Sequence, residues 1–146
     1  MTAVQKLGGD MTAVQKSLRI PQDTVKEIER IAGESGRDFS SVTKDLLSEA
    51  IKMHKCPGIV FADGVTGRRA RVGIEVWEVI ANYKSINQNF KRLQKAYHWL
   101  TEQQLRAAIG YYNAYGKEVD DQIERNESWS RNTVTKSYPH LPRGRE

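Results

Sequence analysis

The chain has 146 residues and a formal net charge of +5, and 28% of its residues are charged while 38% are hydrophobic. This composition is typical of a soluble globular protein, and no apolar run approaches the roughly 18 residues that span a membrane. One cysteine and three scattered histidines argue against an internal disulfide and a metal site. Because a signal-peptide pattern is also absent, we expect a cytoplasmic protein without a cofactor or a membrane partner. The positive charge favours polyanionic partners.

A six-residue repeat opens the chain. Met-Thr-Ala-Val-Gln-Lys occupies residues 1–6 and recurs at residues 11–16. Six residues are too few for one unit of a repeat protein. We interpret residues 1–10 as a tag or an upstream extension before a start at Met11.

Residues 11–55 are predicted to form a first domain, which begins with a short strand over residues 15–20. Leu18 and Ile20 fall on one face of this strand. The alternating polar side chains fall on the other face: Gln15, Ser17 and Arg19. Pro21 ends the strand.

Two amphipathic helices are predicted to follow the strand, at residues 22–34 and 41–54. The first ends before Gly36, and Ser40 is the expected N-cap of the second. A single strand has no partner for its backbone groups, and a domain this small buries little surface. We therefore expect two copies of the chain to pair their strands as an antiparallel ribbon.

This order of elements resembles the ribbon-helix-helix repressors and antitoxins. The residues that carry the resemblance are Gln15-x-Ser17-Leu18-Arg19-Ile20-Pro21 and Gly36-Arg37-Asp38-Phe39-Ser40-Ser41. In that family the paired strands enter the major groove of DNA, and the start of the second helix holds a backbone phosphate. The resemblance therefore implies a homodimer that binds double-stranded DNA.

The resemblance also implies roles for individual side chains. Bases would be read by Gln15, Ser17 and Arg19. The chemistry is suitable, because arginine can bond both O6 and N7 of guanine and glutamine can bond N6 and N7 of adenine. Phosphates would be held by Ser40 and Ser41. Lys16 departs from the pattern, because it lies on the strand face of Leu18 and Ile20: either its stem lies along the end of the ribbon and its ammonium binds a phosphate, or the strand register is shifted by one residue. The alternatives to the DNA contacts are an ordinary edge strand and an ordinary helix cap.

Residues 56–127 are predicted to form a second domain, a β-hairpin followed by a helical bundle. The expected strands cover residues 59–62 and 68–72. The expected helices cover residues 75–83, 87–97, 101–115 and 117–126, with a capping box from Thr101 to Gln104. This domain is similar to small antitoxin-associated domains that join a hairpin to a helix-turn-helix-like bundle. The similar stretches are residues 57–60, 67–72, 76–80 and 100–112.

Three further interpretations concern this second domain. The arginines of the second strand form either a second phosphate-binding strip or a solvated edge that prevents sheet aggregation: Arg68, Arg69 and Arg71. The turn before residue 101 has the length found in helix-turn-helix proteins, which would direct Gln103, Gln104 and Arg106 toward DNA; simple bundle packing is the favoured alternative. The clustered tyrosines and tryptophans are expected to form core rather than a stacking platform for single strands.

Residues 128–146 lose their helical periodicity and are predicted to form a flexible basic tail. If a toxin nuclease with an acidic metal site is the partner, the tail would bind it by folding on contact. The basic side chains available for this are Arg131, Arg143 and Arg145. A tail that only improves solubility is the alternative.

The sequence thus predicts a mainly α protein with an N-terminal ribbon-helix-helix and a small C-terminal helical bundle that carries a hairpin. No catalytic constellation is recognisable, so we do not expect an enzyme. The expected function is that of a sequence-specific transcriptional repressor, the autoregulating antitoxin of a toxin-antitoxin pair. Its expected partners are operator DNA, a second copy with further assembly on DNA, and a cognate toxin. The alternatives are a dimeric protein-binding adaptor and a plasmid-segregation or RNA-binding factor.

Overall fold

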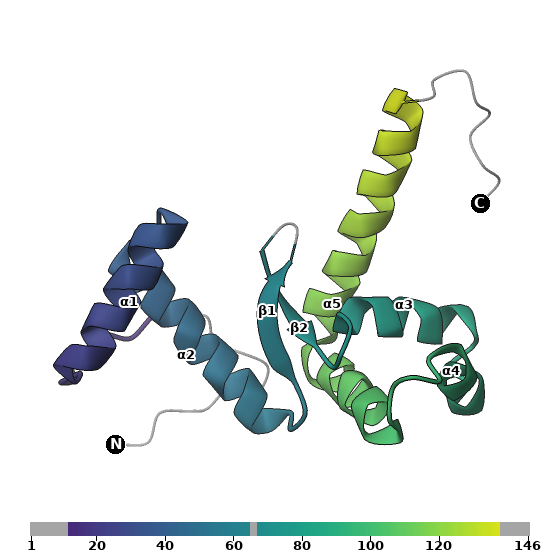
Figure 1. Cartoon of the computed structure of the whole chain (residues 1–146), viewed down its shortest axis with the longest axis horizontal. Helices are drawn as coiled ribbons and strands as arrows, with labels where there is room; N and C mark the ends of the chain where they lie inside the picture. Colours follow the sequence, from purple (N-terminus) through teal and green to yellow (C-terminus); the bar gives the residue numbers. More distant parts are fainter. Residues whose placement is uncertain (1–11, 65–66, 138–146) are drawn as a thin grey trace. The chain divides into compact units, whose positions relative to one another are not determined.

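A computed structural model of the chain describes residues 12–64 and 67–137 (Figure 1). In these ranges the chain forms five helices and one antiparallel hairpin, which confirms a mainly helical fold with a small two-stranded sheet. The helices are α1 (Gln22–Ser35), α2 (Phe39–Lys55), α3 (Val76–Ser85), α4 (Phe90–Ala96) and α5 (Glu102–Ser137), and the strands are β1 (Val60–Gly64) and β2 (Gly67–Arg71). The chain divides into two compact units, and the boundary between them lies inside α2. The units are Met1–Asp45 and Leu46–Glu146.

The first unit contains α1, the turn after it and the first part of α2. Helix α1 confirms the prediction for residues 22–34, and it ends because Gly36 adopts the left-handed conformation, with φ of 65°, and its N–H bonds the carbonyl of Ala32. Three residues form the buried core: Ile28, Ala32 and Val42. This core is very small for a folded unit.

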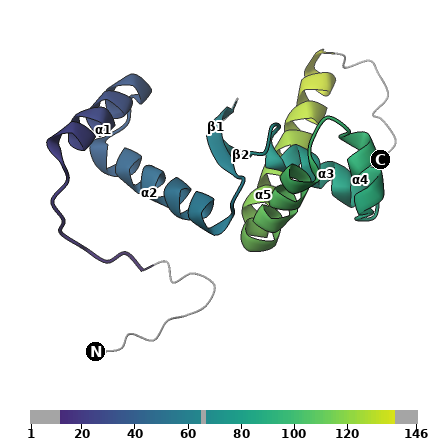
Figure 2. The ribbon, with the colours of Figure 1, turned by 60° about the horizontal axis from the view of Figure 1, so that its bottom comes forward.

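The second unit has the larger core, in which α3 lies against the first half of α5 and α4 lies beside α3 (Figure 2). The completely buried side chains of this core include Ile80, Leu93, Leu105, Tyr111 and Val119. The hydroxyl of Tyr111 donates to Glu118, and burial raises the pKa of this hydroxyl. The tyrosine is therefore a core residue, as predicted. The same prediction is wrong for Trp99, whose side chain is 59% exposed.

The hairpin is formed as predicted for residues 59–72. Val60 pairs with Arg71 and Phe61 pairs with Ala70 in an antiparallel register. Phe61 packs edge-on against Tyr111, with ring centroids 6.2 Å apart. The hairpin is therefore part of the wall of the second core.

Helix α5 confirms one predicted boundary and corrects another. Its backbone is non-helical at Tyr115, with φ of −130° and ψ of 44°, where the sequence predicts the break between helices 101–115 and 117–126. The prediction that helical structure ends at residue 128 is wrong, since the helix continues to Ser137. Adding a residue to an existing helix requires no new nucleus, so polar residues of modest helix propensity can extend it.

Two further properties hold for the part of the chain that the structure describes. No helix there is long and apolar enough to cross a membrane. No group of three or more His, Cys, Asp or Glu residues there is placed to hold a metal ion.

Candidate nucleic-acid interface

The polar residues expected to read DNA lie in an exposed segment before α1. Residues 12–20 are neither helix nor strand, and the side chains of this segment up to Arg19 are exposed. The exposed residues include the four of this segment that the sequence assigns to DNA: Gln15, Lys16, Ser17 and Arg19. The structure thus leaves these side chains accessible to a ligand.

The strand predicted over residues 15–20 is wrong for the single chain. The two strands among the described residues, β1 and β2, lie after α2 instead. The reason is that a strand needs hydrogen-bond partners for its backbone groups, and none of the residues that the structure describes pairs with the segment as a strand. The apolar side chains of the segment are consequently left in solvent, with Val14 71% and Leu18 73% exposed.

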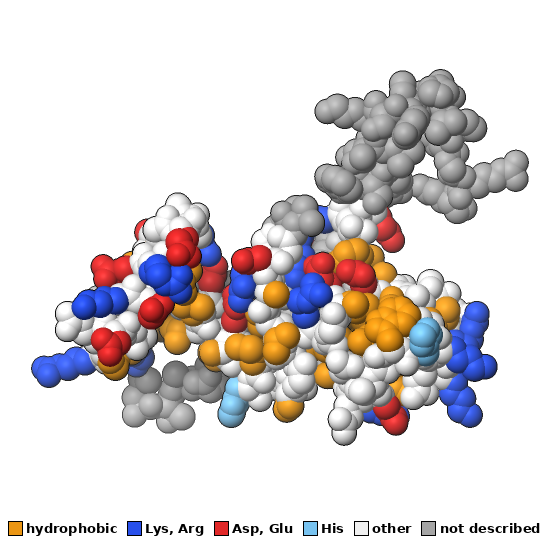
Figure 3. Space-filling view, in the orientation of Figure 1, with side chains coloured by type: hydrophobic (Ala, Val, Ile, Leu, Met, Phe, Trp, Pro, Cys, Tyr) orange, Lys and Arg blue, Asp and Glu red, His pale blue; other side chains and the backbone are white. Residues whose placement is uncertain are grey.

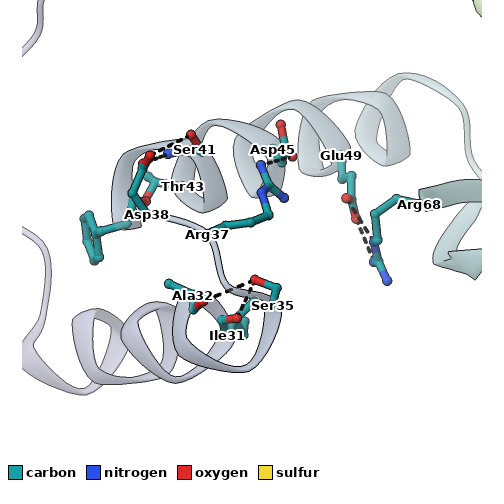
Figure 4. A network of polar contacts seen from close by, with 11 residues as sticks. Ile31, Ala32, Ser35, Arg37, Asp38, Ser41, Thr43, Asp45, Glu49 and Arg68 are labelled. Atoms are coloured by element: carbon teal, nitrogen blue, oxygen red, sulfur yellow. Dashed lines mark hydrogen bonds and ion pairs between the residues drawn. The ribbon is translucent and has the colours of Figure 1, made fainter. Parts of the chain in front are cut away.

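The start of α2 differs from the prediction by two residues. The helix begins at Phe39, and its N-cap is Asp38 rather than Ser40 (Figure 4). A carboxylate oxygen of Asp38 accepts a hydrogen bond from the backbone N–H of Ser41 at 2.7 Å, and its other oxygen accepts from the Ser41 hydroxyl at 3.3 Å. Aspartate and serine cap helices equally well, so the position that fits the turn geometry decides between them.

This cap changes what the two serines can offer to a phosphate. Both donors of Ser41 are already bonded to Asp38, whereas the side chain of Ser40 is exposed and lies one residue closer to the helix end. The hydrogen bond from the Ser41 backbone lowers the pKa of the Asp38 carboxyl, so the carboxylate remains charged at neutral pH. At pH values above the ordinary pKa of aspartate, the hydrogen-bonded carboxylate of Asp38 stabilises the folded state. This stabilisation is lost as the pH falls through the lowered pKa of the folded state. A phosphate approaching this helix end therefore meets a negative charge.

Helix α2 carries an exposed row of large apolar side chains, which we call the apolar stripe. Its members are Phe39, Leu46, Leu47, Ile51 and Met53. Leu47 is 59% and Ile51 is 55% exposed. The spacing of seven residues from Phe39 to Leu46 and again to Met53 is that of helices that pack lengthwise against another helix. The stripe is thus a surface suited to a partner helix.

The arginines of β2 are used to hold the hairpin in place. Arg68 donates to both carboxylate oxygens of Glu49 in α2, at 3.1 and 2.8 Å (Figure 4), and its guanidinium lies 3.3 Å from Asp63. The guanidinium of Arg69 lies 3.6 Å from Glu75, and Arg71 donates to the carbonyl of Gly73 at 3.3 Å. These contacts place carboxylates beside the charges of Arg68 and Arg69. The presence of these arginines is therefore explained without a phosphate-binding strip and without a solvated edge that prevents aggregation.

The residues of the helix-turn-helix interpretation are also engaged within the second unit. Gln104 and Thr101 form the predicted capping box: the side-chain oxygen of Gln104 accepts from the N–H of Thr101 at 2.8 Å, and the hydroxyl of Thr101 accepts in return at 3.1 Å. Arg106 donates to Glu102 at 2.8 Å and lies over the ring of Phe90 at 4.5 Å. Only Gln103 of the three predicted residues is exposed without such a contact in the described part.

The basic residues of the predicted tail fall mostly beyond the structural description. Arg131 lies in the last part of α5, and its side chain is not described. Arg143 and Arg145 lie outside the described residues.

Sequence reasoning missed two features, one in each unit. The first is the capping role of Asp38, which the spacing Asp-x-x-Ser could have indicated. The second is a run of residues from Val79 to Thr101 that contains no Asp or Glu but four Lys or Arg. A simple count of charges along the chain reveals this run, which forms α4 and its surroundings.

Comparisons with known proteins supply no relative for this surface or for the rest of the chain. No family model, curated protein or solved structure matches it.

Proposed function

We propose that the chain is a homodimeric, sequence-specific DNA-binding repressor in which two N-terminal segments pair as a ribbon in the major groove. The observation that carries this proposal is the alternation of the exposed segment before α1. Leu18 and Ile20 occupy one set of alternate positions, and the DNA-reading candidates Gln15, Ser17 and Arg19 occupy the other. Pairing with a second copy would bury the first set and leave the second set facing outward.

The apolar stripe of α2 supports a second copy as the partner. A ribbon alone buries few side chains, whereas a dimer that also covers Leu46, Leu47 and Ile51 removes large apolar surfaces from water. The first unit has three buried residues of its own, so pairing of its N-terminal segment with a second copy would add burial that this small core does not supply. Both exposed features are then explained by one assembly.

The narrower role that we propose is that of the autoregulating antitoxin of a toxin-antitoxin pair. This part rests on the resemblance of residues 15–41 to ribbon-helix-helix antitoxins and of residues 57–112 to antitoxin-associated domains. In this role the ribbon would bind the operator of its own gene, and the basic residues near the C-terminus would bind an acidic toxin surface. Binding of one operator by two dimers is compatible with the proposal.

The direct test is a fluorescence-anisotropy titration of the full chain against the DNA upstream of its gene and against a scrambled duplex of equal length. We expect tight, saturable binding to the upstream duplex and weak, salt-sensitive binding to the scrambled one. Equal affinity for the two duplexes would refute sequence-specific recognition. It would favour the adaptor interpretation, in which the first unit serves only for dimerisation.

A charge change at the cap of α2 tests whether this helix end faces a phosphate. Asp38→Asn is expected to raise the affinity for upstream DNA by about three- to tenfold at 0.1 M salt, because it removes a negative charge from the helix N-terminus in both copies. Asparagine caps helices as well as aspartate, so α2 should still begin at Phe39. The measurement is the same anisotropy titration, with far-UV circular dichroism as the check on helix content.

The matched control for this variant is Glu124→Gln, which changes the net charge equally at an exposed position of α5. We expect it to change the affinity by less than about twofold. Equal gains from the two variants would mean that only net charge matters and that Ser40 does not lie at a phosphate.

A further inference from the structure

Helix α4 presents the densest group of unpaired cations in the described part of the chain. Its exposed basic side chains are Lys91, Arg92 and Lys95. Figure 3 shows Lys and Arg side chains gathered over α4, at the right edge of the visible face. No carboxylate of the described residues makes an ion pair with any of the three. We call these three residues the α4 cations.

Other basic residues of the same unit form ion pairs with carboxylates. Lys52 pairs with Glu118, Lys84 pairs with Asp120, and Arg106 pairs with Glu102. The contrast follows from the sequence, because the nearest acids along the chain are Glu78 before α4 and Glu102 after it. The α4 cations thus lie within a stretch of the chain that supplies no neutralising charge.

The positions of these cations carry an energetic cost within the isolated chain. Lys91 and Lys95 are four residues apart, which places two like charges next to each other on one side of a helix. Such a pair is destabilising by a few tenths of a kcal/mol unless an anion lies beside it. An external polyanion would remove this repulsion.

The helix that carries the cations is firmly held to the second core. The side chain of Leu93, on the inner face of α4, is completely buried. The side chain of Asn89 caps the helix by accepting a hydrogen bond from the backbone N–H of Arg92 at 3.1 Å. Just after the helix, the hydroxyl of Tyr97 donates to the backbone carbonyl of Glu78 at 3.3 Å. The three charges are therefore presented from a fixed backbone.

We propose that the α4 cations bind the phosphate backbone of DNA and form a second contact in addition to the ribbon. This inference rests on the proposed function for the identity of the polyanion. A group of exposed cations suits phosphates better than the centre of a protein interface, because protein interfaces are depleted of charged residues at their centres. The contact adds affinity without reading sequence, since phosphates are the same at every base pair.

The test is a triple variant of the full chain, Lys91→Gln with Arg92→Gln and Lys95→Gln, titrated against the upstream and scrambled duplexes at several salt concentrations. We expect affinity for both duplexes to fall by about tenfold or more at 0.15 M salt, with their ratio unchanged. The slope of log affinity against log salt should become shallower by about 2 to 5, because each lost phosphate contact removes about 0.9 and a dimer loses up to six. Glutamine is a good helix former, and a thermal melt will show whether α4 remains folded.

The matched control is Lys26→Gln with Lys55→Gln and Arg125→Gln, which removes the same charges from three exposed positions on different helices. If the α4 variant changes the salt slope no more than this control, the inference is overturned. The result also separates the two proposals. A shallower slope in a protein that does not prefer upstream DNA would keep the α4 contact and reject the ribbon, whereas a preserved preference with an unchanged slope would do the reverse.

Discussion

Replacing Arg19 with alanine is expected to lower the affinity for upstream DNA about a hundredfold or more and to remove most of the preference over a scrambled duplex. An arginine that bonds both O6 and N7 of guanine contributes about 1–3 kcal/mol of discrimination, and a dimer presents two such residues. The scrambled duplex is bound through phosphates, so its affinity should change by less than about fivefold. The measurement is anisotropy at about physiological salt, where specific binding commonly exceeds non-specific binding by roughly a thousandfold or more.

Arg125→Ala is the matched control for Arg19→Ala. It removes the same guanidinium from an exposed helical position for which the described residues provide no ion pair. We expect it to leave the preference for upstream DNA unchanged. If the two variants behave alike, base reading by Arg19 is wrong and the positive charge alone accounts for binding.

Introducing a charge into the apolar stripe is expected to separate the dimer. Leu47→Glu should weaken self-association by about a hundredfold or more, because each copy loses about 1.5–3 kcal/mol of side-chain burial and acquires a buried charge without a partner. Leu47 is 59% exposed in the single chain, so its own fold depends little on this side chain. Analytical ultracentrifugation at about 10 μM should show a dimer for the wild type and a monomer for the variant.

The neighbouring substitution Ser48→Glu provides the control for this experiment. Ser48 is exposed on the same helix, and one residue further along it faces about 100° away from Leu47, outside the apolar stripe. We expect this variant to remain dimeric. A dimeric Leu47→Glu protein would exclude the stripe as the interface, and a wild type that stays monomeric would reject the homodimer itself. Should Leu47→Glu lose its helical signal, Leu47→Ala tests the same contact with a smaller loss.

The helices that could be predicted from the sequence are those with clear end signals. Pro21 and Gly36 delimit α1, and the pair Thr101 and Gln104 marks the start of α5. These residues act through local backbone geometry, which neighbouring residues are sufficient to determine. The break at Tyr115 was predictable for a similar reason, because Gly116 follows it and weakens the helix there.

The remaining elements depend on information that local sequence does not contain. Asp38 and Ser40 are both good caps, and the choice of Asp38 depends on the length of the turn from α1. A strand at residues 15–20 depends on a partner, so alternation of side chains alone could not establish it in one chain. The continuation of α5 past residue 128 depends on the stability of the helix that precedes it rather than on the composition of the segment.

Some features of the candidate site could be predicted from the sequence and others could not. The exposure of Gln15, Ser17 and Arg19 follows from their polarity and position, and the structure agrees with it. The pairing of Arg68 with Glu49 could not be read from the sequence, because the two residues come together only when the hairpin folds back onto α2. Charge along the sequence therefore did not show that Arg68 is paired with a carboxylate of α2.

The three-residue core of the first unit has a consequence for how a repressor of this kind would respond to its own abundance. If folding of this unit is completed only when two copies associate, mass action links folding, dimerisation and operator occupancy. The active species then increases with the square of the chain concentration while the dimer is scarce. Repression would begin steeply above a threshold level of the protein and would disappear just as steeply on dilution, without any ligand to signal the change.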